Sequence, residues 1–298
     1  MSEIKKIILD TDIGIDCDDA AALGLLLNAH SQKQCELIGI TAATTREGAT
    51  STIKAICNYY EINVPIGTLC GSPLPCDKIN NYAKAIKNKY GHADVSLDAV
   101  ELFRRLLASA SEKVSIIAVG PLPNIANLLR SAPDQYSSLN GCELVKEKVS
   151  SIYIMGGTFV DNFCEWNLLQ DISSARYVSD HCPVEMIYCP HEIGNIVKTR
   201  MLDSDNPVWF SMLAFARSVQ ETIYPSFYRQ SLDPVTSMLA IDKYSELFVL
   251  SDNGRITIDE NGYTKHERNN RFSHRYVTLK TNIQEIELLV NNIIEPQG

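Results

Sequence analysis

The stretch that decides the fold reads Ile7-Ile8-Leu9-Asp10-Thr11-Asp12-Ile13-Gly14-Ile15-Asp16-Cys17-Asp18-Asp19-Ala20. An apolar run gives way to five carboxylates within ten positions, and an apolar segment to Leu27 follows. This order is typical of a buried strand, an acidic loop and the start of a helix. Because like charges repel, we expect a cation and backbone N–H groups at the helix start to hold this loop together.

The kind of cation follows from the kind of ligand. Carboxylates are hard oxygen ligands, which suit Ca²⁺ or Mg²⁺ rather than zinc. A simpler interpretation is a solvated acidic turn in which Asp18 or Asp19 caps the helix. We favour the cation site, because acidic loops rarely lie at the carboxyl end of a buried strand.

Composition and charge exclude several classes of protein. The 298 residues carry a formal net charge of −9 and no basic tract, so nucleic acid is an unexpected partner. Nine cysteines form no C-x-x-C pair, which predicts reduced thiols in a cytoplasmic protein rather than disulfides or a zinc site. We expect no signal peptide and no membrane span, because no apolar run approaches ~18 residues.

Strand-like runs alternate with helical segments through the first two-thirds of the chain. The strands are predicted at 6–10, 36–43, 114–119, 151–155 and 183–188. The pattern predicts a single α/β domain over 1–298, with a mostly parallel, Rossmann-like sheet flanked by helices. Further on, we expect a long helix at 206–230, a helix at 233–241 and a late β element at 255–258 and 276–279. Ligands bind beyond the carboxyl ends of such strands.

Several segments resemble one enzyme family in their order along the chain. Asp10-Thr11-Asp12-Ile13-Gly14 and Asp18-Asp19-Ala20 resemble the signature of the inosine–uridine-preferring nucleoside hydrolase family. Its mid-chain, sugar-binding and late aspartate motifs are similar to Val119-Gly120-Pro121-Leu122-Pro123-Asn124-Ile125-Ala126, Met155-Gly156-Gly157, Glu165-Trp166-Asn167 and Leu232-Asp233-Pro234. The resemblance spans roughly the whole chain and implies the nucleoside hydrolase fold.

The resemblance also implies a metal site. A Ca²⁺ ion would lie at the bottom of a ribose pocket, held by the carboxylates of Asp12, Asp19 and Asp233 and by the backbone carbonyl of Pro123. The ion would lower the pKa of its bound water, and Asp12 would act as general base while this water attacks the anomeric carbon.

The resemblance further assigns the ribose contacts. Asp18, Glu165 and Asn167 would hold the ribose hydroxyls. Met155 would line the pocket, although ordinary strand packing is an equal alternative. For Trp166 we expect core packing rather than stacking on the base.

Two more carboxylates of the acidic loop need an interpretation. Asp10 is predicted to be a structural acceptor for loop N–H groups. Asp16 lies in what looks like a two-residue expansion, Asp16-Cys17, and is expected to be a solvent-facing charge; another register would make it a ligand.

The side of the pocket that faces the base departs from the family pattern. The family's histidine before the late aspartate is Leu232 here, which cannot donate a proton, and a second histidine is replaced by Tyr90. The asparagine after the second strand aligns with Arg46, which suggests an anionic riboside bound by an arginine at the pocket rim.

Other side chains are candidates to replace the missing acid. Tyr228 is the first choice to meet the base, and Tyr224 shares its helical face at i, i+4, with amphipathic packing as an equal alternative. His92 is a further candidate, because the loop 71–94 has the length of an active-site lid. His191, near a predicted strand end, ranks lower among these candidates and is expected to serve local structure.

The leading hypothesis is a Ca²⁺-dependent N-ribohydrolase that acts on a nucleoside or related riboside. The resemblance implies a homodimer or homotetramer that serves purine or pyrimidine salvage. One alternative is a ribose- or nucleoside-binding protein with little or no catalysis, because Leu232 replaces the usual acid. Another is a phosphatase of the haloacid dehalogenase type, with Asp10 as nucleophile and Mg²⁺ as the metal, because Asp10-x-Asp12 after a strand is also its opening motif.

Overall fold

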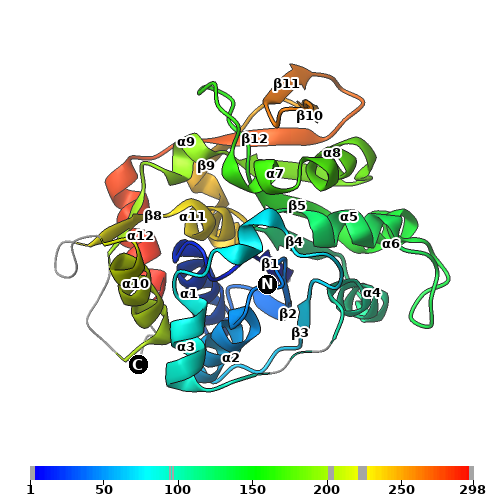
Figure 1. Cartoon of the computed structure of the whole chain (residues 1–298). Helices are drawn as coiled ribbons and strands as arrows, with labels where there is room; N and C mark the ends of the chain where they lie inside the picture. The colour runs from blue at the N-terminus through cyan, green and yellow to red at the C-terminus, as the bar shows by residue number, and fades with distance from the viewer. Residues whose placement is uncertain (1–3, 94, 96, 201–204, 221–226, 295–298) are drawn as a thin grey trace.

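A central sheet with helices on both faces forms the frame of the molecule (Figure 1). The computed structural model describes residues 4–93, 95, 97–200, 205–220 and 227–294. The strand order is β11-β10-β12-β6-β5-β4-β1-β2-β3, with β9 paired to β12. The strands of this sheet are β1 Lys6–Thr11, β2 Glu36–Ala42, β3 Ile66–Thr68, β4 Val114–Ala118, β5 Val149–Met155, β6 Glu185–Cys189, β9 Phe248–Leu250, β10 Gly254–Ile258, β11 Thr264–Arg268 and β12 His274–Leu279.

The direction of the strands agrees with the sequence pattern. Every neighbouring pair from β3 to β12 is parallel, whereas β9, β10 and β11 join antiparallel. The residues of β4 are all buried, because helices cover a parallel strand on both faces. The mostly parallel α/β sheet is therefore confirmed, and the late β element forms its antiparallel edge, at the top of Figure 1.

Two sets of helices cover the two faces of the sheet. The helices are α1 Asp18–Ser31, α2 Ala49–Tyr59, α3 Ala83–Tyr90, α4 Ala99–Ser109, α5 Pro123–Arg130, α6 Gly141–Lys148, α7 Trp166–Gln170, α8 Ile172–His181, α9 His191–Gly194, α10 Pro207–Ser218, α11 Leu232–Leu239 and α12 Ile283–Ile294. One buried cluster joins the sheet to α1, α2, α10, α11 and α12, and a second joins it to α4, α5, α6 and α8.

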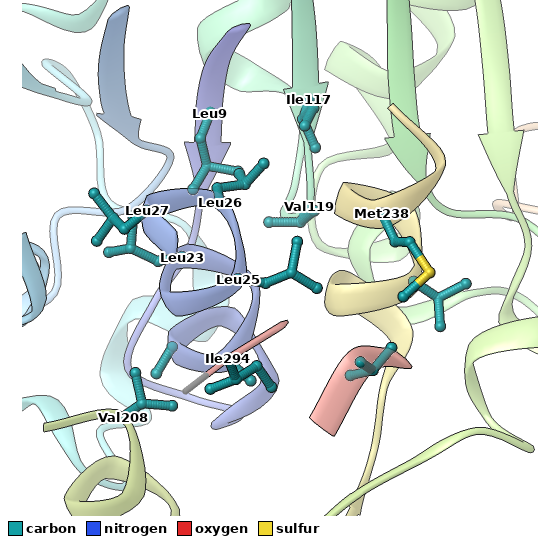
Figure 2. Packing of buried hydrophobic residues seen from close by; sticks show 14 of the residues in the cluster. Leu9, Leu23, Leu25, Leu26, Leu27, Ile117, Val119, Val208, Met238 and Ile294 are labelled. Atoms are coloured by element: carbon teal, nitrogen blue, oxygen red, sulfur yellow. The ribbon is translucent and has the colours of Figure 1, made fainter. Parts of the chain in front are cut away.

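The buried cluster around α1 positions the acidic loop that precedes this helix. Leucines of α1 pack beneath Leu9 and Val119, with Met238 of α11 beside them (Figure 2). Helix α1 is buried along nearly its whole length because α2, α10, α11 and α12 surround it. This packing brings the first turn of α11, from the last third of the chain, to the first turn of α1.

The long helix predicted at 206–230 is wrong. Helix α10 ends at Ser218, and Tyr228–Gln230 forms strand β8, which pairs antiparallel with β7, Lys198–Arg200. The sequence contains Pro225 in this interval, and a proline cannot donate the hydrogen bond that a helix interior requires. Tyr228 lies in a strand, so the prediction that it shares a helical face with Tyr224 is wrong.

The cysteines and the helices bear on what the sequence predicts for disulfides and membrane spans. All nine cysteines are free thiols. Among the helices that the structure describes, none is both long enough and apolar enough to span a bilayer.

Candidate active site

A cavity of about 260 Å³ opens where β1, β4 and β5 end. Its lining contains eight of the residues that the sequence singled out: Asp12, Asp18, Asp19, Met155, Glu165, Trp166, Asn167 and Asp233. The remaining lining residues are Ile15, Asp16, Val119, His191, Arg229 and Leu232. The loops after three parallel strands and the start of α11 therefore meet in one place, at the carboxyl edge of the sheet.

Three carboxylates form the floor of this cavity. Oxygens of Asp18, Asp19 and Asp233 all lie within 4.8 Å of one another. Asp18 and Asp19 stand in the first turn of α1, and Asp233 stands in the first turn of α11. The Asp233 N–H donates to Asp18 Oδ2 at 3.2 Å, and the Thr11 hydroxyl donates to Asp19. Two helix N-termini thus face the same negative charge, which their dipoles favour.

The alternative of a solvated capping turn is wrong. Asp18 and Asp19 are each 3% exposed, and Asp233 is 4% exposed. The N-cap residue of α1 is Cys17, which makes no side-chain cap. The carboxylates therefore lie inside the protein and face one another, an arrangement that suits a metal ion with hard oxygen ligands.

Asp12 and Pro123 were predicted to be metal ligands together with Asp19 and Asp233, whereas Asp18 was assigned to the ribose; the observed group contains Asp18 instead of Asp12. Asp12 lines the cavity but lies outside the three-carboxylate group, next to Gly120, where an added Cβ would stand 2.6 Å from Asp12 Oδ1. Gly120 therefore leaves the room that the Asp12 carboxylate occupies. Pro123 is the buried first residue of α5 and is absent from the cavity lining, so the role of its carbonyl stays a prediction.

Burial disfavours the charged forms of the carboxyl groups in this site. The pKa of Asp12 is raised to about 6, mainly by burial and also by the charge of Asp16, against the opposing charge of Arg46. Burial and the neighbouring carboxylates hold the pKa of Asp18, Asp19 and Asp233 well above the usual range. A bound cation would offset this cost by favouring the charged forms.

The predicted ribose contacts form one connected wall. Glu165 caps α7, accepting from the N–H groups of Asn167 at 2.8 Å and Leu168 at 3.1 Å. Asn167 Nδ2 donates to the Val119 carbonyl at 3.0 Å and lies 3.2 Å from Met155 Sδ. Met155 both packs in the core and lines the cavity, so each of its two alternatives holds.

The core position expected for Trp166 is wrong. Its side chain is 48% exposed and lines the cavity. Helix α7 buries Asn167 and Leu168, so Trp166 stays on the opposite, open side of the helix. The ring is therefore available to a ligand.

Asp10 is a structural acceptor, as expected, but its donors are side chains. It accepts from Thr41 Oγ1 at 2.6 Å and from Asn124 Nδ2 at 2.8 Å, and it is fully buried. Because Asp10 is absent from the cavity lining, it cannot serve as the nucleophile of a phosphatase.

Asp16 is neither a free surface charge nor part of the three-carboxylate group. It accepts from Arg229 Nε at 2.7 Å and also from Arg229 Nη2, and both side chains line the cavity. The acidic loop and strand β8 are therefore joined at the cavity edge by a bidentate ion pair.

The predicted role of Arg46 at a pocket rim is wrong. Its side chain is fully buried and donates to the backbone carbonyls of Asp12, Ile13, Cys76 and Ile79. Because its N–H groups donate to these carbonyls, the guanidinium anchors the acidic loop. Arg46 is absent from the cavity lining and does not face a ligand there.

The expected base-side residues lie elsewhere. Tyr228 lines a second cavity, with Lys198 and Arg200, because it belongs to β8. Tyr224 lies outside the described residues. His92 is exposed, near Glu47, and is absent from the lining of the first cavity.

Arg229 and His191 also line the cavity, although neither was a leading candidate from the sequence. Arg229 directly follows Tyr228, and alternation along a strand would have sent the two side chains to opposite faces. For His191 the available signal was its position just after a predicted parallel strand, where ligand contacts concentrate.

Comparison with known proteins places this geometry in context. A sequence model described as inosine-uridine preferring nucleoside hydrolase matches residues 7–285. The pyrimidine-specific ribonucleoside hydrolase RihB of Escherichia coli O157:H7 (strain EC4115 / EHEC) is 29% identical over 198 residues, which cover 59% of this chain and 56% of that protein. The chain thus matches little more than half the length of this relative.

Solved structures share the fold. An inosine-uridine preferring nucleoside hydrolase from Bacillus anthracis superposes with a TM-score of 0.73 at 18% identity, covering 99% of this chain and 100% of that chain. A purine-preferring ribonucleoside hydrolase from Gardnerella vaginalis gives 0.71 at 15% identity, covering 97% and 98%. At these identities the likeness shows the fold alone.

Arg46→Met is expected to destabilise the fold by about 2–4 kcal/mol, because it leaves buried carbonyls without donors. Urea unfolding followed by circular dichroism measures the change. Arg268→Met is the matched control, since Arg268 is 75% exposed and its ion pair with Asp252 lies in solvent. Equal stability of the two variants would contradict the anchoring role of Arg46.

Chelator-treated protein is expected to lose stability as pH rises from about 6.5 to 8. The pKa values of Asp10 and Glu165, raised to about 7 by burial, exceed those of the unfolded chain, so the folded state holds extra protons that it must release. The lowered pKa of His274, about 4, acts mainly below this window. Thermal melts in EDTA test the sign; a melting temperature that rises with pH would contradict it.

Proposed function

This chain belongs to the inosine-uridine preferring nucleoside hydrolase family, and we propose that it is a Ca²⁺-dependent N-ribohydrolase cleaving the N-glycosidic bond of a nucleoside or related riboside. The observation that carries this proposal is the buried group of Asp18, Asp19 and Asp233 in a cavity that Glu165 and Asn167 also line. A sugar diol and a cation are the complementary partners of such a floor.

The donor set fits Ca²⁺. This ion takes about six to eight oxygens in flexible geometry, and carboxylates with sugar hydroxyls and water supply that kind of shell. Asp18, Asp19 and Asp233 would hold it, with Asp12 beside them. When bound, the ion supplies positive charge that makes a neighbouring water easier to deprotonate.

Asp12 is proposed as the general base. Its carboxylate faces the cavity at the end of β1, in the space that Gly120 leaves open. A base at this position would accept a proton from water while the oxygen attacks the anomeric carbon.

The ribose would be oriented by side chains that line the cavity. Asp18, Glu165 and Asn167 present polar atoms to the cavity, and Met155 presents an apolar surface. The hydrogen bonds that Glu165 and Asn167 make to backbone groups fix their positions before substrate arrives. Holding the sugar this way places its anomeric carbon for attack.

Residues 1–298 are proposed to act as one domain. Asp18 and Asp233, from opposite ends of the chain, meet in one site, and late strand β12 pairs with β6 in the shared sheet. We also propose a cytoplasmic homodimer or homotetramer acting in nucleoside salvage, on the strength of the free thiols and of the family resemblance.

Calcium is expected to raise the stability of chelator-treated protein by about 2–3 kcal/mol at a concentration one hundred times its Kd. Asp19→Asn and Asp233→Asn should each lose most of this gain. Asp252→Asn, at an exposed position, should keep it. Differential scanning calorimetry with and without CaCl₂ measures the shift, and an unchanged response in Asp233→Asn would remove Asp233 from the ligand set.

Asp12→Asn is expected to reduce kcat by about 10²–10⁴-fold while the fold is kept, because the amide cannot accept the water proton. Release of ribose from inosine, uridine and p-nitrophenyl riboside measures turnover, and circular dichroism monitors the fold. Full activity in Asp12→Asn would exclude it as the base. If the wild-type chain hydrolyses none of these compounds yet binds ribose, the binding-protein alternative holds.

A further inference from the structure

The cavity lacks a donor at the position where the family pattern most often places one. Leu232 lines the cavity directly before Asp233, and its side chain can neither donate a proton nor accept one. The base that leaves a ribose carries negative charge as the glycosidic bond breaks. A hydrogen-bond donor beside it would stabilise that charge.

The neighbouring helix supplies a side chain to this region. Helix α9 begins at His191 and ends at Gly194, where an added Cβ would stand only 2.4 Å from the Leu232 Cα. His191 lies one turn before this contact and also lines the cavity. An imidazole therefore enters the same cavity as Leu232 from the helix that touches it.

The backbone of His191 is hydrogen-bonded, and its ring contacts an aromatic neighbour. The backbone N–H of His191 donates to the Gly157 carbonyl at 3.0 Å, and its ring meets Phe163 edge-on with centroids 5.0 Å apart. The next residue, Glu192, accepts from the N–H groups of Phe159, Val160 and Asp161 at 2.7–3.0 Å. Helix α9 and the loop that carries Phe163 are thus one connected unit.

Among the described lining residues, two other donor side chains already make hydrogen bonds within the protein, and a third is half-exposed. Arg229 uses its Nε and Nη2 on Asp16. Asn167 uses its Nδ2 on Val119 and Met155. The ring N–H of Trp166 belongs to a side chain that is half-exposed, unlike that of His191. Among the described residues that line this cavity, His191 is the only histidine.

We propose that His191 is a catalytic residue of the N-ribohydrolase proposed above, donating a hydrogen bond from its ring N–H to the departing nucleobase. The glycosidic electron pair passes to the base nitrogen, water oxygen bonds to the anomeric carbon, and Asp12 accepts the water proton. The anionic base leaves hydrogen-bonded to the imidazole and then takes a proton from solvent. Burial lowers the pKa of His191, which keeps the ring neutral at pH 7 and suits it to this role.

The test compares leaving groups that differ in their need for help. His191→Phe keeps an aromatic ring against Phe163 and removes the N–H, whereas His191→Gln keeps an N–H donor. Inosine and uridine release poor leaving groups, and p-nitrophenyl riboside releases a stable anion. His181→Gln, at an exposed position of α8 outside this cavity, is the matched control.

For His191→Phe we expect kcat/KM to fall by about 10²-fold on inosine and uridine and by less than about threefold on p-nitrophenyl riboside. His191→Gln should recover about tenfold over His191→Phe on the nucleosides. His181→Gln should match the wild type on every compound. If His191→Phe does not fold, His191→Met replaces it, because it also fills the site without an N–H.

Equal losses on nucleosides and on p-nitrophenyl riboside, or no loss on either, would overturn the role of His191 and leave the ribohydrolase proposal standing. A wild-type chain that hydrolyses none of the three compounds would overturn the ribohydrolase proposal itself, and this role with it.

Discussion

The structure depends on keeping carboxylates from distant parts of the chain together inside the protein. Asp18 and Asp19 come from the first helix, and Asp233 comes from a helix more than two hundred residues later, yet all three are buried within 4.8 Å of one another. Such a group is unfavourable by itself, because burial and mutual repulsion both oppose its charge. Two helix N-termini and an oxygen-binding cation are the agents that can compensate for this cost.

The rest of the fold can be understood as support for that arrangement. The parallel strands deliver their carboxyl-end loops to one edge, and the apolar surface of α1 packs on α11 so that the first turns of both helices face the cavity. Behind the loop, Arg46 binds the carbonyls of Asp12 and Ile13. At its front, the ion pair of Asp16 with Arg229 connects the loop to strand β8. The loop is thus fixed from two sides before any ligand binds.

The sequence predicted the half of the site that consists of local motifs. Asp18 and Asp19 are adjacent, Glu165 and Asn167 are two positions apart, and their strand–loop–helix contexts determine where they point. Arg46 was misplaced because alignment to an asparagine position says nothing about the carbonyls that surround the longer side chain. Tyr228 was misplaced because a helical spacing was assumed where pairing with Lys198–Arg200 makes a strand. Burial and pairing with distant residues decided both cases, and neither is visible in a short window of sequence.

Helices α9 and α11 each contribute a residue at their start to the cavity, His191 and Leu232. Helix α9 and the start of α11 approach so closely that only glycine fits at position 194 against the Leu232 backbone. Leu232 and His191 consequently line the same cavity, and a polar side chain on either helix start would reach it. The carboxylate floor allows no such choice, because its three members must meet at one point from fixed helix starts. The floor thus depends on Asp18, Asp19 and Asp233 together, whereas Leu232 and His191 line the cavity from two separate helix starts.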